Sequence, residues 1–598
     1  MLRIVLPLIL LTLGCTRASG SLPEAVDAQE AGDAWVESTL ARLTLREKVG
    51  QMVFPFVTGE YLAVGSEAYD RLRDWVVERR VGGLIISIGP PLEVAAKLNL
   101  LQQLADVPLL VTADLEYGPG MRLHGGVVPQ WRLDLGGATS FPPPMAIGAT
   151  GDERLAYEMG RVTALEGRAV GIRLSYAPIA DVNNNPGNPV INTRSYGADP
   201  RRVAAFVAAH VRGLQDHGML ATVKHFPGHG DTNVDSHLDL PVITADRARA
   251  DTVELVPFRA AIAAGVAAVM GGHIAFPKLT GDSVSATLSP AIMTELLGEE
   301  LGFKGLVVTD ALNMGAIVKR YGAGQAAVLA VKAGNDVLLM PPDVGAAIDA
   351  VVAAVERGEI PESRIDASVR KLLQVKADLG LHRERLVDLN RIPEVVGNPA
   401  HRALAAEAAE RSITAVRDRQ RLLPLGGAGR RRVLSVVYTA NPDPLAGSVF
   451  QQTLASHLPG VRTMTLDARA ASELSAVRAA ANRADVVVFS LFVRVLPGAG
   501  TGTLAVPASV AGLISEVGAR RPTVVVAFGN PYVLEQFPNI GTYVLAWGQE
   551  AASQRAAARA LAGEVPITGK LPIDLPPFHA RGEGLEIAGR RASAGAAQ

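Results

Sequence analysis

Short apolar runs alternate with longer amphipathic segments through the first two thirds of the chain. Eight runs have the length and composition of buried strands: residues 52–57, 83–88, 108–113, 174–180, 219–223, 267–271, 305–309 and 336–340. Stretches rich in Ala, Leu, Glu and Arg lie between most of them, such as 152–169, 201–215 and 247–264. Because a buried parallel strand reads as a continuous apolar run, the pattern predicts repeated βα units. Eight such units predict a (β/α)8 TIM barrel over residues 33–384, with a doubly wound open sheet as the competing topology.

A second pattern of the same kind begins near residue 401. Residues 385–400 contain Asp, Asn, Pro and Gly and are predicted to form a linker. Further apolar runs follow at residues 433–438, 461–466, 485–491, 523–528 and 543–547. With Ala-rich segments between them, they predict a parallel sheet sandwiched by helices, a second α/β domain over residues 401–579. Residues 580–598, rich in Gly, Ala and Arg, are expected to be a disordered tail.

The N-terminal residues have the form of an export signal. Arg3 is followed by an apolar run, Gly14 and Cys15, the only cysteine in the 598 residues. A run of about ten apolar residues suits a signal peptide over residues 1–15 and is too short to span a bilayer, so export to the cell envelope or periplasm is expected. Gly14-Cys15 resembles a bacterial lipobox, which implies a lipid anchor on Cys15; a plain signal peptide with an incidental cysteine is the alternative. Residues 16–32 are small and polar and are expected to be a flexible tether.

The charge balance bears on possible partners. The chain has 58 Lys and Arg against 59 Asp and Glu, a formal net charge of −1. Nucleic-acid binding requires concentrated positive charge, so no nucleic acid is expected as a partner. A membrane contact is expected only through the possible lipid anchor.

The densest group of ionisable residues follows the fifth apolar run. The segment from Lys224 to Pro241 reads KHFPGHGDTNVDSHLDLP and contains three histidines. Its Gly, Pro, Asp and Asn residues make a poor helix and a poor strand interior, so it is predicted to be a loop at the carboxyl end of a strand. In α/β barrels the loops at that end carry the chemistry.

A metal site is one alternative for this segment. Its ligands would come from His225, His229, Asp231, Asp235 and His237. Pro227 and Gly228 disfavour that reading, because they interrupt the helix on which histidines four residues apart usually bind a metal.

The segment resembles the signature loop of the β-N-acetylhexosaminidase branch of glycoside hydrolase family 3. Residues 44–51, TLREKVGQ, also resemble the family's N-terminal signature, and Thr44 and Glu47 have the spacing of a helix capping box. The resemblance implies that Lys224 and His225 bind the terminal sugar. Family members commonly carry a second α/β domain, so the resemblance extends over nearly the whole chain.

Asp310 is the predicted nucleophile. It ends the apolar run 305–309 and is followed by ALNM, which resembles the nucleophile motif of the family. A retaining glycosidase needs such a carboxylate together with an acid/base on the leaving-group side. By the resemblance, His237 is the acid/base and Asp235 orients its imidazole, a group that exchanges protons near neutral pH. The alternatives are a helix-capping role for Asp310 and a structural role for His237.

Polar side chains at other predicted strand ends would complete the site. Asp114 follows the run 108–113, Arg122 lies eight residues later, and Arg194 resembles a further sugar-binding arginine of the family. Asp181 and the asparagines after it are predicted to shape a turn at the rim.

Two features depart from the family pattern. After the first Asp the family usually has Gln or Leu and then Glu-Gly-Gly, whereas here Glu116 is followed by Tyr-Gly-Pro-Gly. A longer insertion at 124–137 also follows, and it includes Trp131. They leave the aglycone preference open.

The resemblance implies a retaining exo-β-N-acetylglucosaminidase without cofactor or metal. Its substrates would be peptidoglycan fragments or chitooligosaccharides ending in β-linked N-acetylglucosamine. A family 3 β-glucosidase, a glycoside phosphorylase and a non-catalytic sugar-binding envelope lipoprotein are the alternatives. The His-Asp pair argues against an ordinary β-glucosidase, whose acid/base carboxylate usually comes from elsewhere, whereas a neutral imidazole also suits an anionic phosphate nucleophile. The second domain shows no comparable ionisable cluster and is not expected to donate an acid.

Overall fold

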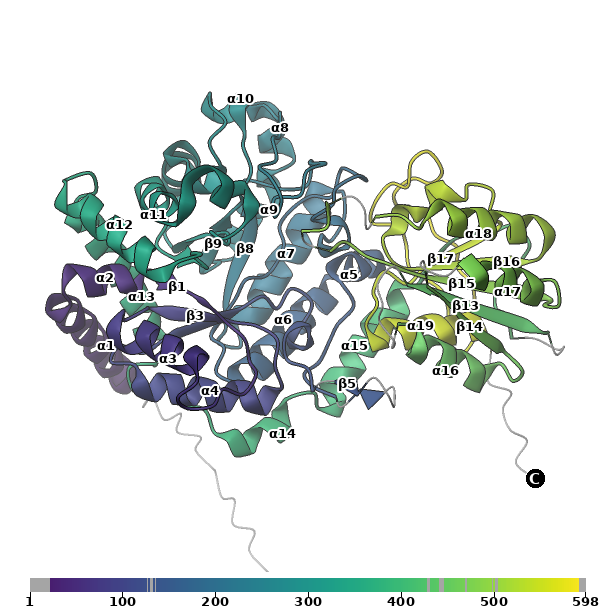
Figure 1. The fold of residues 1–598 in the computed structure, drawn as a ribbon, viewed down its shortest axis with the longest axis horizontal. Helices are drawn as coiled ribbons and strands as arrows, with labels where there is room; N and C mark the ends of the chain where they lie inside the picture. Colours follow the sequence, from purple (N-terminus) through teal and green to yellow (C-terminus); the bar gives the residue numbers. More distant parts are fainter. Residues whose placement is uncertain are drawn as a thin grey trace, which may run out of the picture.

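The computed structural model describes residues 22–125, 127–128, 133–134, 136–426, 431–439, 446–467, 471–496, 498–500 and 504–590. Two α/β bodies lie side by side, the first coloured purple to blue-green and the second green to yellow (Figure 1). The predicted leader with Cys15, and Trp131, lie outside the described residues. Among the helices that are described, none combines the length and the apolar character that a membrane crossing requires.

The first body is the predicted barrel. Within the described ranges its parallel sheet has seven strands in the order β10-β9-β8-β7-β4-β3-β2. The strands are β2 (Phe56–Val57), β3 (Gly83–Ile86), β4 (Leu110–Ala113), β7 (Leu174–Ser175), β8 (Leu220–Phe226), β9 (Ala268–Gly271) and β10 (Leu306–Thr309). The two ends of this sheet meet through β11 (Leu338–Leu339), which follows a bridge between Val308 and Val337 and pairs with β1 (Val53–Phe54). Since β1 continues into β2 across Pro55, the ring closes as in a barrel and not as an open sheet.

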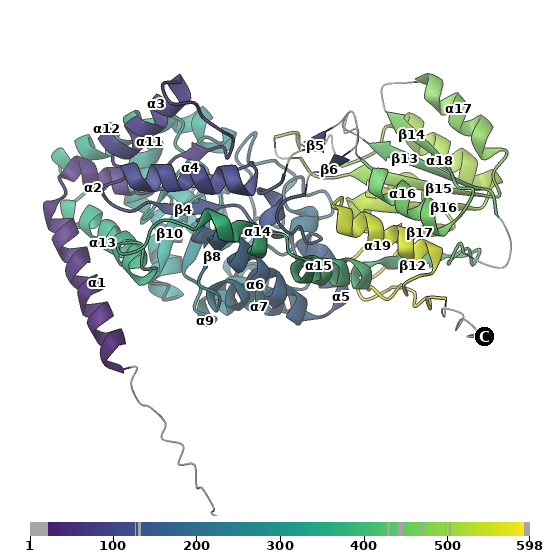
Figure 2. The same cartoon turned by 90° about the horizontal axis from the view of Figure 1, so that it is seen from below.

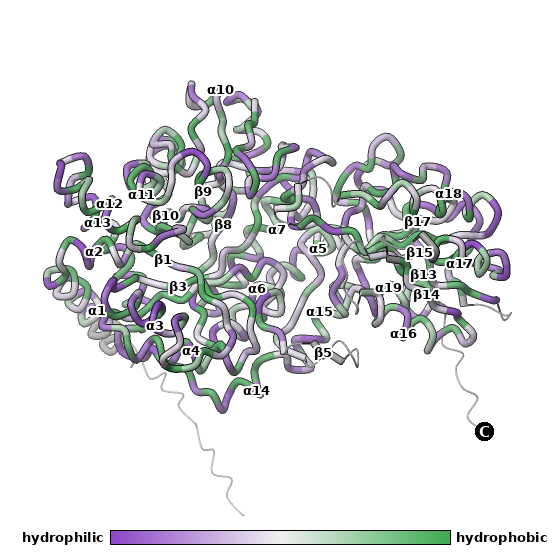
Figure 3. The backbone as a smooth tube through the Cα atoms, viewed as in Figure 1, coloured by the Kyte–Doolittle hydropathy of each residue, from purple (hydrophilic) through white to green (hydrophobic). Residues whose placement is uncertain are grey.

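Burial explains why the apolar runs become strands. All four residues of β10 are buried, and in β8 only Leu220 is partly exposed. Figure 3 shows hydrophobic residues concentrated on the strands at the centre of both bodies. The run predicted at 174–180 yields only the short strand β7, because Pro178 has no N–H to donate to the ladder.

Helices form the outer layer of the barrel. They include α4 (Pro91–Leu104), α6 (Glu153–Ala169), α7 (Pro200–Gln215), α11 (Gly315–Ala333), α12 (Val344–Glu356) and α13 (Glu362–Asp378). The predicted capping box starts α2 (Leu45–Gln51), where Thr44 and Glu47 exchange hydrogen bonds. The helix predicted over 247–264 is split into α8 (Arg247–Thr252) and α9 (Leu255–Ala263). Pro257 is the third residue of α9, where a backbone N–H would have no partner within the helix, so a proline is tolerated there.

The predicted tether is partly helical. Helix α1 (Leu22–Arg42) begins inside residues 16–32 and lies along α13 (Figure 2). Arg370 of α13 donates to Glu37, and Gln374 donates to Asp33. Ala and Glu favour helix, and α13 supplies a packing surface that local sequence does not reveal. The predicted tether boundary at residue 32 is therefore wrong.

The second body is the predicted α/β sandwich, but its sheet is mixed. In the part of the chain that is described, six strands run in the order β12-β17-β16-β15-β13-β14. The five predicted runs form its parallel strands: β13 (Val433–Thr439), β14 (Arg462–Asp467), β15 (Val486–Val493), β16 (Thr523–Gly529) and β17 (Thr542–Leu545). An unpredicted strand, β12 (Thr414–Asp418), pairs antiparallel with β17 at the edge. Helices cover the sheet, among them α15 (Pro399–Ser412), α16 (Ser448–His457), α18 (Ala508–Arg520) and α19 (Ala551–Ala562).

The predicted linker and tail are both ordered in part. Within the linker, α14 (Ile392–Val395) follows Val387, which exchanges two hydrogen bonds with the side chain of Asn99 on α4. In the tail, Leu585 donates its N–H to Ala415 of β12, and Ile587 pairs with Ile567. Prediction of disorder from residue 580 is therefore wrong as far as residue 590, because these residues pair with the edge of the second domain.

Candidate active site

The carboxyl ends of the barrel strands surround a cavity of about 580 Å³. The predicted site residues that line it are Asp114, Arg122, Arg194, Lys224, His225, His237 and Asp310. Asp235 contacts His237 from behind. All of the predicted site residues are thus brought together at one rim, although Asp114 and Asp310 belong to strands far apart in the sequence.

Asp310 follows β10 and is held as an anion. Its Oδ1 accepts a hydrogen bond of 2.8 Å from the N–H of Ala311. Burial acts to raise the pKa of Asp310, but His273, His225, the Ala311 N–H and Lys224 together lower it to about 2. The carboxylate is therefore ionised at neutral pH, as a nucleophile must be.

Asp310 does not cap the next helix. Helix α11 begins at Gly315, and its N-cap residue is Met314. The capping role considered for Asp310 is therefore wrong. The start of α11 instead anchors the loop that carries Asp235 and His237, since Gly315 donates its N–H to the His237 carbonyl and Ala316 donates to the Ser236 carbonyl.

Asp235 and His237 form a hydrogen-bonded pair in the loop after β8. Asp235 Oδ1 lies 2.8 Å from His237 Nδ1 and accepts the backbone N–H of His237 at 2.9 Å. Burial acts to raise the pKa of Asp235, but hydrogen bonds from His237 and from the Gly500 N–H lower it. A carboxylate only accepts, so the proton between them belongs to Nδ1, and Nε2 is left to exchange a proton with a substrate.

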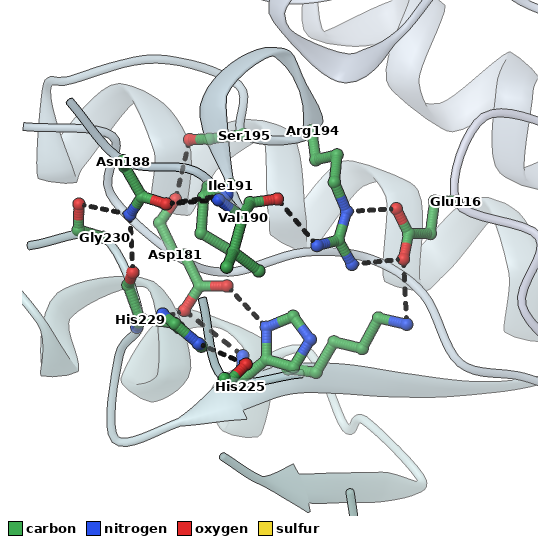
Figure 4. A network of polar contacts seen from close by, with 12 residues as sticks. Glu116, Asp181, Asn188, Val190, Ile191, Arg194, Ser195, His225, His229 and Gly230 are labelled. Atoms are coloured by element: carbon green, nitrogen blue, oxygen red, sulfur yellow. Dashed lines mark hydrogen bonds and ion pairs between the residues drawn. The ribbon is translucent and has the colours of Figure 1, made fainter. Parts of the chain in front are cut away.

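Glu116 joins two cations of the cavity wall, Arg194 and Lys224. Arg194 donates from Nε and Nη2 to its two carboxylate oxygens at 2.8 and 2.7 Å (Figure 4). Lys224 Nζ lies 2.9 Å from Oε1. Burial would raise the pKa of Glu116, but Arg194 and Lys224 hold it well below its usual range. The group is a fixed set of charges that can donate to and accept from sugar hydroxyls.

Asp114 completes this set. Its Oδ1 lies 2.7 Å from Lys224 Nζ, and its Oδ2 lies 3.3 Å from Arg122 Nη2. Despite burial, which acts in the opposite direction, the charges of Lys224 and Arg122 lower the pKa of Asp114. The motif resemblance did not assign a role to Glu116, yet it lies only two residues beyond Asp114, at the same rim.

Asp181 supports the site from behind and is more than the predicted turn former. Its Oδ2 lies 2.8 Å from His225 Nδ1, and its Oδ1 accepts the backbone N–H groups of His225 and His229 at 3.3 and 2.6 Å (Figure 4). Burial acts to raise the pKa of Asp181, but the two histidines lower it. The sequence holds one indication of this role: Asp181 directly follows the apolar run 174–180, just as Asp114 and Asp310 directly follow apolar runs.

His229 braces the loop from inside. Its Nε2 lies 3.0 Å from Ser236 Oγ, and its carbonyl accepts from Asn188. Burial lowers the pKa of His229 to about 4, so the ring is neutral. Across the described ranges, no group of three or more His, Cys, Asp or Glu side chains is placed to hold a metal ion.

The second domain forms part of the cavity wall. Residues 494–496, after β15, and residues 547–550, after β17, line the cavity. Glu550 is partly buried, and burial raises its pKa to about 7 although Arg494 acts to lower it. The sequence predicts no ionisable cluster in the second domain comparable to that of the barrel, and it does not single out Arg494 and Glu550, which the structure places in the cavity wall. Local sequence did not reveal them because they come from different loops and meet only in the folded chain.

The chain matches two family models in sequence order. The first, Glycosyl hydrolase family 3 N terminal domain, covers residues 44–375, and the second, Glycosyl hydrolase family 3 C-terminal domain, covers residues 395–586. The chain is also 31% identical over 567 residues to a protein of Cellulomonas fimi named beta-N-acetylglucosaminidase/beta-glucosidase. That alignment covers 91% of this chain and 96% of the relative.

Two solved structures are similar over nearly the whole chain. A glycoside hydrolase family 3 beta-N-acetylglucosaminidase from Paenibacillus sp. str. FPU-7 is 36% identical, with a TM-score of 0.78 over 89% of this chain and 99% of its own. A beta-glucoside phosphorylase is 27% identical, with a TM-score of 0.79 over 92% of this chain and 96% of its own. Since the first family model alone matches more than half of the chain, and the second extends the match across the other domain, this protein belongs to glycosyl hydrolase family 3.

Proposed function

We propose that this family 3 glycoside hydrolase is a retaining exo-β-N-acetylglucosaminidase. The observation that carries the proposal is that Asp310 and His237, whose imidazole is bonded to Asp235, line one cavity from different loops of the barrel. Retention requires a nucleophile and a separate acid/base, and these residues supply both. The name of the Paenibacillus structure supports N-acetylglucosamine as the sugar, and that of the Cellulomonas fimi relative includes it together with glucose.

The first half of the reaction forms a covalent intermediate. A carboxylate oxygen of Asp310 attacks the anomeric carbon while protonated His237 gives its Nε2 proton to the glycosidic oxygen. The bond between the anomeric carbon and that oxygen breaks, the leaving sugar departs as an alcohol, and a glycosyl ester of Asp310 remains.

The second half reverses these roles. Neutral His237 takes a proton from water as the water oxygen attacks the anomeric carbon, which breaks the ester and releases Asp310 as a carboxylate. Two inversions at one carbon give net retention. Asp235 remains an anion throughout, holding Nδ1–H so that Nε2 faces the reaction.

Sugar binding is assigned to the charged residues around the nucleophile. Asp114, Arg122, Arg194, Lys224 and His225 would contact the hydroxyl and acetamido groups of one terminal sugar. Their charges are already paired within the protein, so little reorganisation is needed when the sugar binds. The second domain covers this cavity with residues 547–550, which suits removal of a single terminal residue.

Phosphorolysis is the second candidate. The similarity to the beta-glucoside phosphorylase supports it, because two proteins of one family and architecture can differ only in the nucleophile of the second half-reaction. A neutral imidazole next to the ester repels an incoming phosphate less than a carboxylate would.

The natural setting is also part of the proposal. The apolar start of the chain and Gly14-Cys15 support export to the cell envelope, with a lipid anchor on Cys15. Peptidoglycan fragments and chitooligosaccharides carry terminal β-linked N-acetylglucosamine and are the substrates we assign.

A substrate comparison tests the activity. The purified enzyme is given nitrophenyl β-glycosides of N-acetylglucosamine and of glucose, with and without inorganic phosphate. We expect kcat/KM to favour N-acetylglucosamine by at least about tenfold, because a site that hydrogen-bonds the acetamido group leaves that contact unmade with glucose. The first product by NMR should be free β-N-acetylglucosamine in both buffers. A preference for glucose, or a sugar 1-phosphate as product, would contradict the proposal.

A further inference from the structure

A loop of the second domain reaches the acid/base pair of the barrel. The backbone N–H of Gly498 lies 2.9 Å from Asp235 Oδ2, and that of Gly500 lies 3.3 Å from the same oxygen. The other oxygen, Oδ1, is occupied by His237. The carboxylate therefore contacts the imidazole on one side and the backbone of another domain on the other.

The backbone conformation of this loop depends on glycine. Gly498 has φ of +81° and Gly500 has φ of +61°, in the left-handed region that other residues rarely adopt. In this conformation two N–H groups can converge on one anion. The same loop also contributes Leu496 to the cavity wall. Two independent features, hydrogen bonding to Asp235 and lining of the cavity, thus place the loop at the site.

We propose that Gly498 and Gly500 are positioning residues for the acid/base reaction, acting through Asp235. Their two N–H groups hold Asp235 in the orientation that keeps His237 Nε2 toward the leaving group. The second domain then takes part in proton transfer without supplying an acid. This inference rests on the proposed acid/base role of His237.

A carboxylate that is hydrogen-bonded through only one of its oxygens can rotate. With Oδ2 fixed by two N–H donors, rotation of the carboxylate would break two charge-assisted hydrogen bonds as well as the bond to His237. A fixed carboxylate fixes the imidazole plane, and proton transfer is sensitive to that geometry. Movement of the second domain away from the barrel would remove this support.

The test compares a loop variant with a matched control in the full-length enzyme. The test variant is Gly498→Ala combined with Gly500→Ala, which strains the left-handed backbone and displaces both N–H groups. The control is Gly460→Ala, because Gly460 is also in the second domain, has φ of +90° and has no heavy atom within 4 Å of an added Cβ. Gly498→Ala alone, whose Cβ also meets nothing within 4 Å, is the milder variant if the double one does not fold.

Two substrates distinguish a positioning role in proton transfer from a general loss of enzyme activity. For chitobiose, whose leaving sugar must be protonated, we expect the loop variant to lose about tenfold in kcat/KM. For the dinitrophenyl glycoside, whose leaving group departs without protonation, the loss should be below about twofold, as in the control. Equal losses on both substrates, or no loss on either, would overturn the proposal.

A double-mutant cycle then asks whether the loop acts through Asp235. In an Asp235→Ala background the glycine substitutions should cause no further loss on chitobiose, since the group they position is gone. The same fold loss in both backgrounds would overturn the proposal. The cycle can be run with any β-glycoside that the wild-type enzyme cleaves, so a wrong sugar assignment would not be mistaken for failure of this inference.

Discussion

Asp310 and His237 have different electrostatic surroundings within one cavity. Asp310 has its pKa lowered to about 2, since the nearby histidines, a backbone N–H and Lys224 outweigh the effect of burial. His237 is one-third exposed and contacts the carboxylate of Asp235. A nucleophile that is ionised at neutral pH and an imidazole in the same cavity are what the two half-reactions require.

Replacing His237 with Ala should expose its acid role. We expect kcat/KM for chitobiose to fall about 10³-fold, because the leaving sugar can no longer be protonated, while cleavage of the dinitrophenyl glycoside falls by less than about tenfold. Steady-state and burst kinetics on both substrates measure the difference. His457→Ala, at a partly exposed histidine of the second domain, is the control and should leave both rates unchanged. Equal losses on the two substrates would remove the acid role from His237.

The sequence predicts which residues reach the site better than it predicts which side chains they contact there. The residues chosen by motif and by strand end, such as Asp114 and Asp310, all come to one rim. Glu116 and Asp181 also follow strand ends, but their roles depend on contacts across loops. Glu116 meets Arg194, which lies 78 residues away, and Asp181 meets His225, which lies 44 residues away. Contacts between residues so far apart along the chain cannot be predicted from the local sequence.

Among the elements, β7 and β8 are adjacent strands with linked functions. The loop after β7 brings Asp181 beneath the end of β8, where it accepts from the side chain and backbone of His225 and from the backbone of His229. Because Asp181 is fully buried and anionic, its three contacts depend on its charge.

Asp181→Asn tests that link. An amide can keep its oxygen on the two backbone N–H groups only by turning its NH2 toward His225 Nδ1, so the imidazole N–H loses its acceptor and faces a second donor. We expect a loss of about 3 kcal/mol, seen as a fall in Tm of about 5 °C, and a lower kcat/KM. The control is Asp239→Asn, whose exposed carboxylate pairs with Arg320 and should change Tm by less than about 1 °C. An unchanged Tm in Asp181→Asn would show that the charge is not needed there.

Element boundaries were the least predictable feature. The eight apolar runs of the barrel and the five of the second domain all became strands, because burial and period are encoded locally. Helix α1, strand β12 and residues 580–590 were not predicted. Each is stabilised by a distant partner: α13 for the first, β17 for the second, and β12 with residue 567 for the third.

In the whole molecule, the barrel and the second domain share an interface with both apolar and polar contacts. Met145, Ala146 and Ala149 of the barrel domain are buried within the apolar core of the second domain. His401 Nδ1 of α15 lies 2.7 Å from Glu166 Oε1 of α6, and the hydroxyl of Tyr532 accepts from Asn183 at 2.9 Å. The cavity lies at this interface, with Glu550 in its wall. The sequence predicts two domains and their order, but not that the second one completes the cavity.

Glu550 should make stability depend on pH. Its folded pKa of about 7 lies above the ordinary value of 4.5, so the stabilisation it gives when protonated is present below pH 4.5 and is lost as pH rises through 7. Relative to Glu550→Gln, the wild-type enzyme should therefore lose up to about 3 kcal/mol between these limits. Tm values of both proteins at pH 5 and pH 8 measure this. Glu535→Gln, at an exposed position, should show no such divergence, and a constant difference between Glu550→Gln and wild type would contradict the expectation.

The central claim is that Asp310 and His237 act on the same sugar from opposite sides of one bond. His237→Ala should still transfer N-acetylglucosamine from the dinitrophenyl glycoside to the enzyme, because that leaving group needs no acid, but should lack the base that releases it. Mass spectrometry of the quenched variant, followed by peptide sequencing, is the most direct measurement. We predict a mass gain of one N-acetylglucosaminyl group, located on Asp310. An adduct on another carboxylate, or a burst without any adduct, would contradict the account.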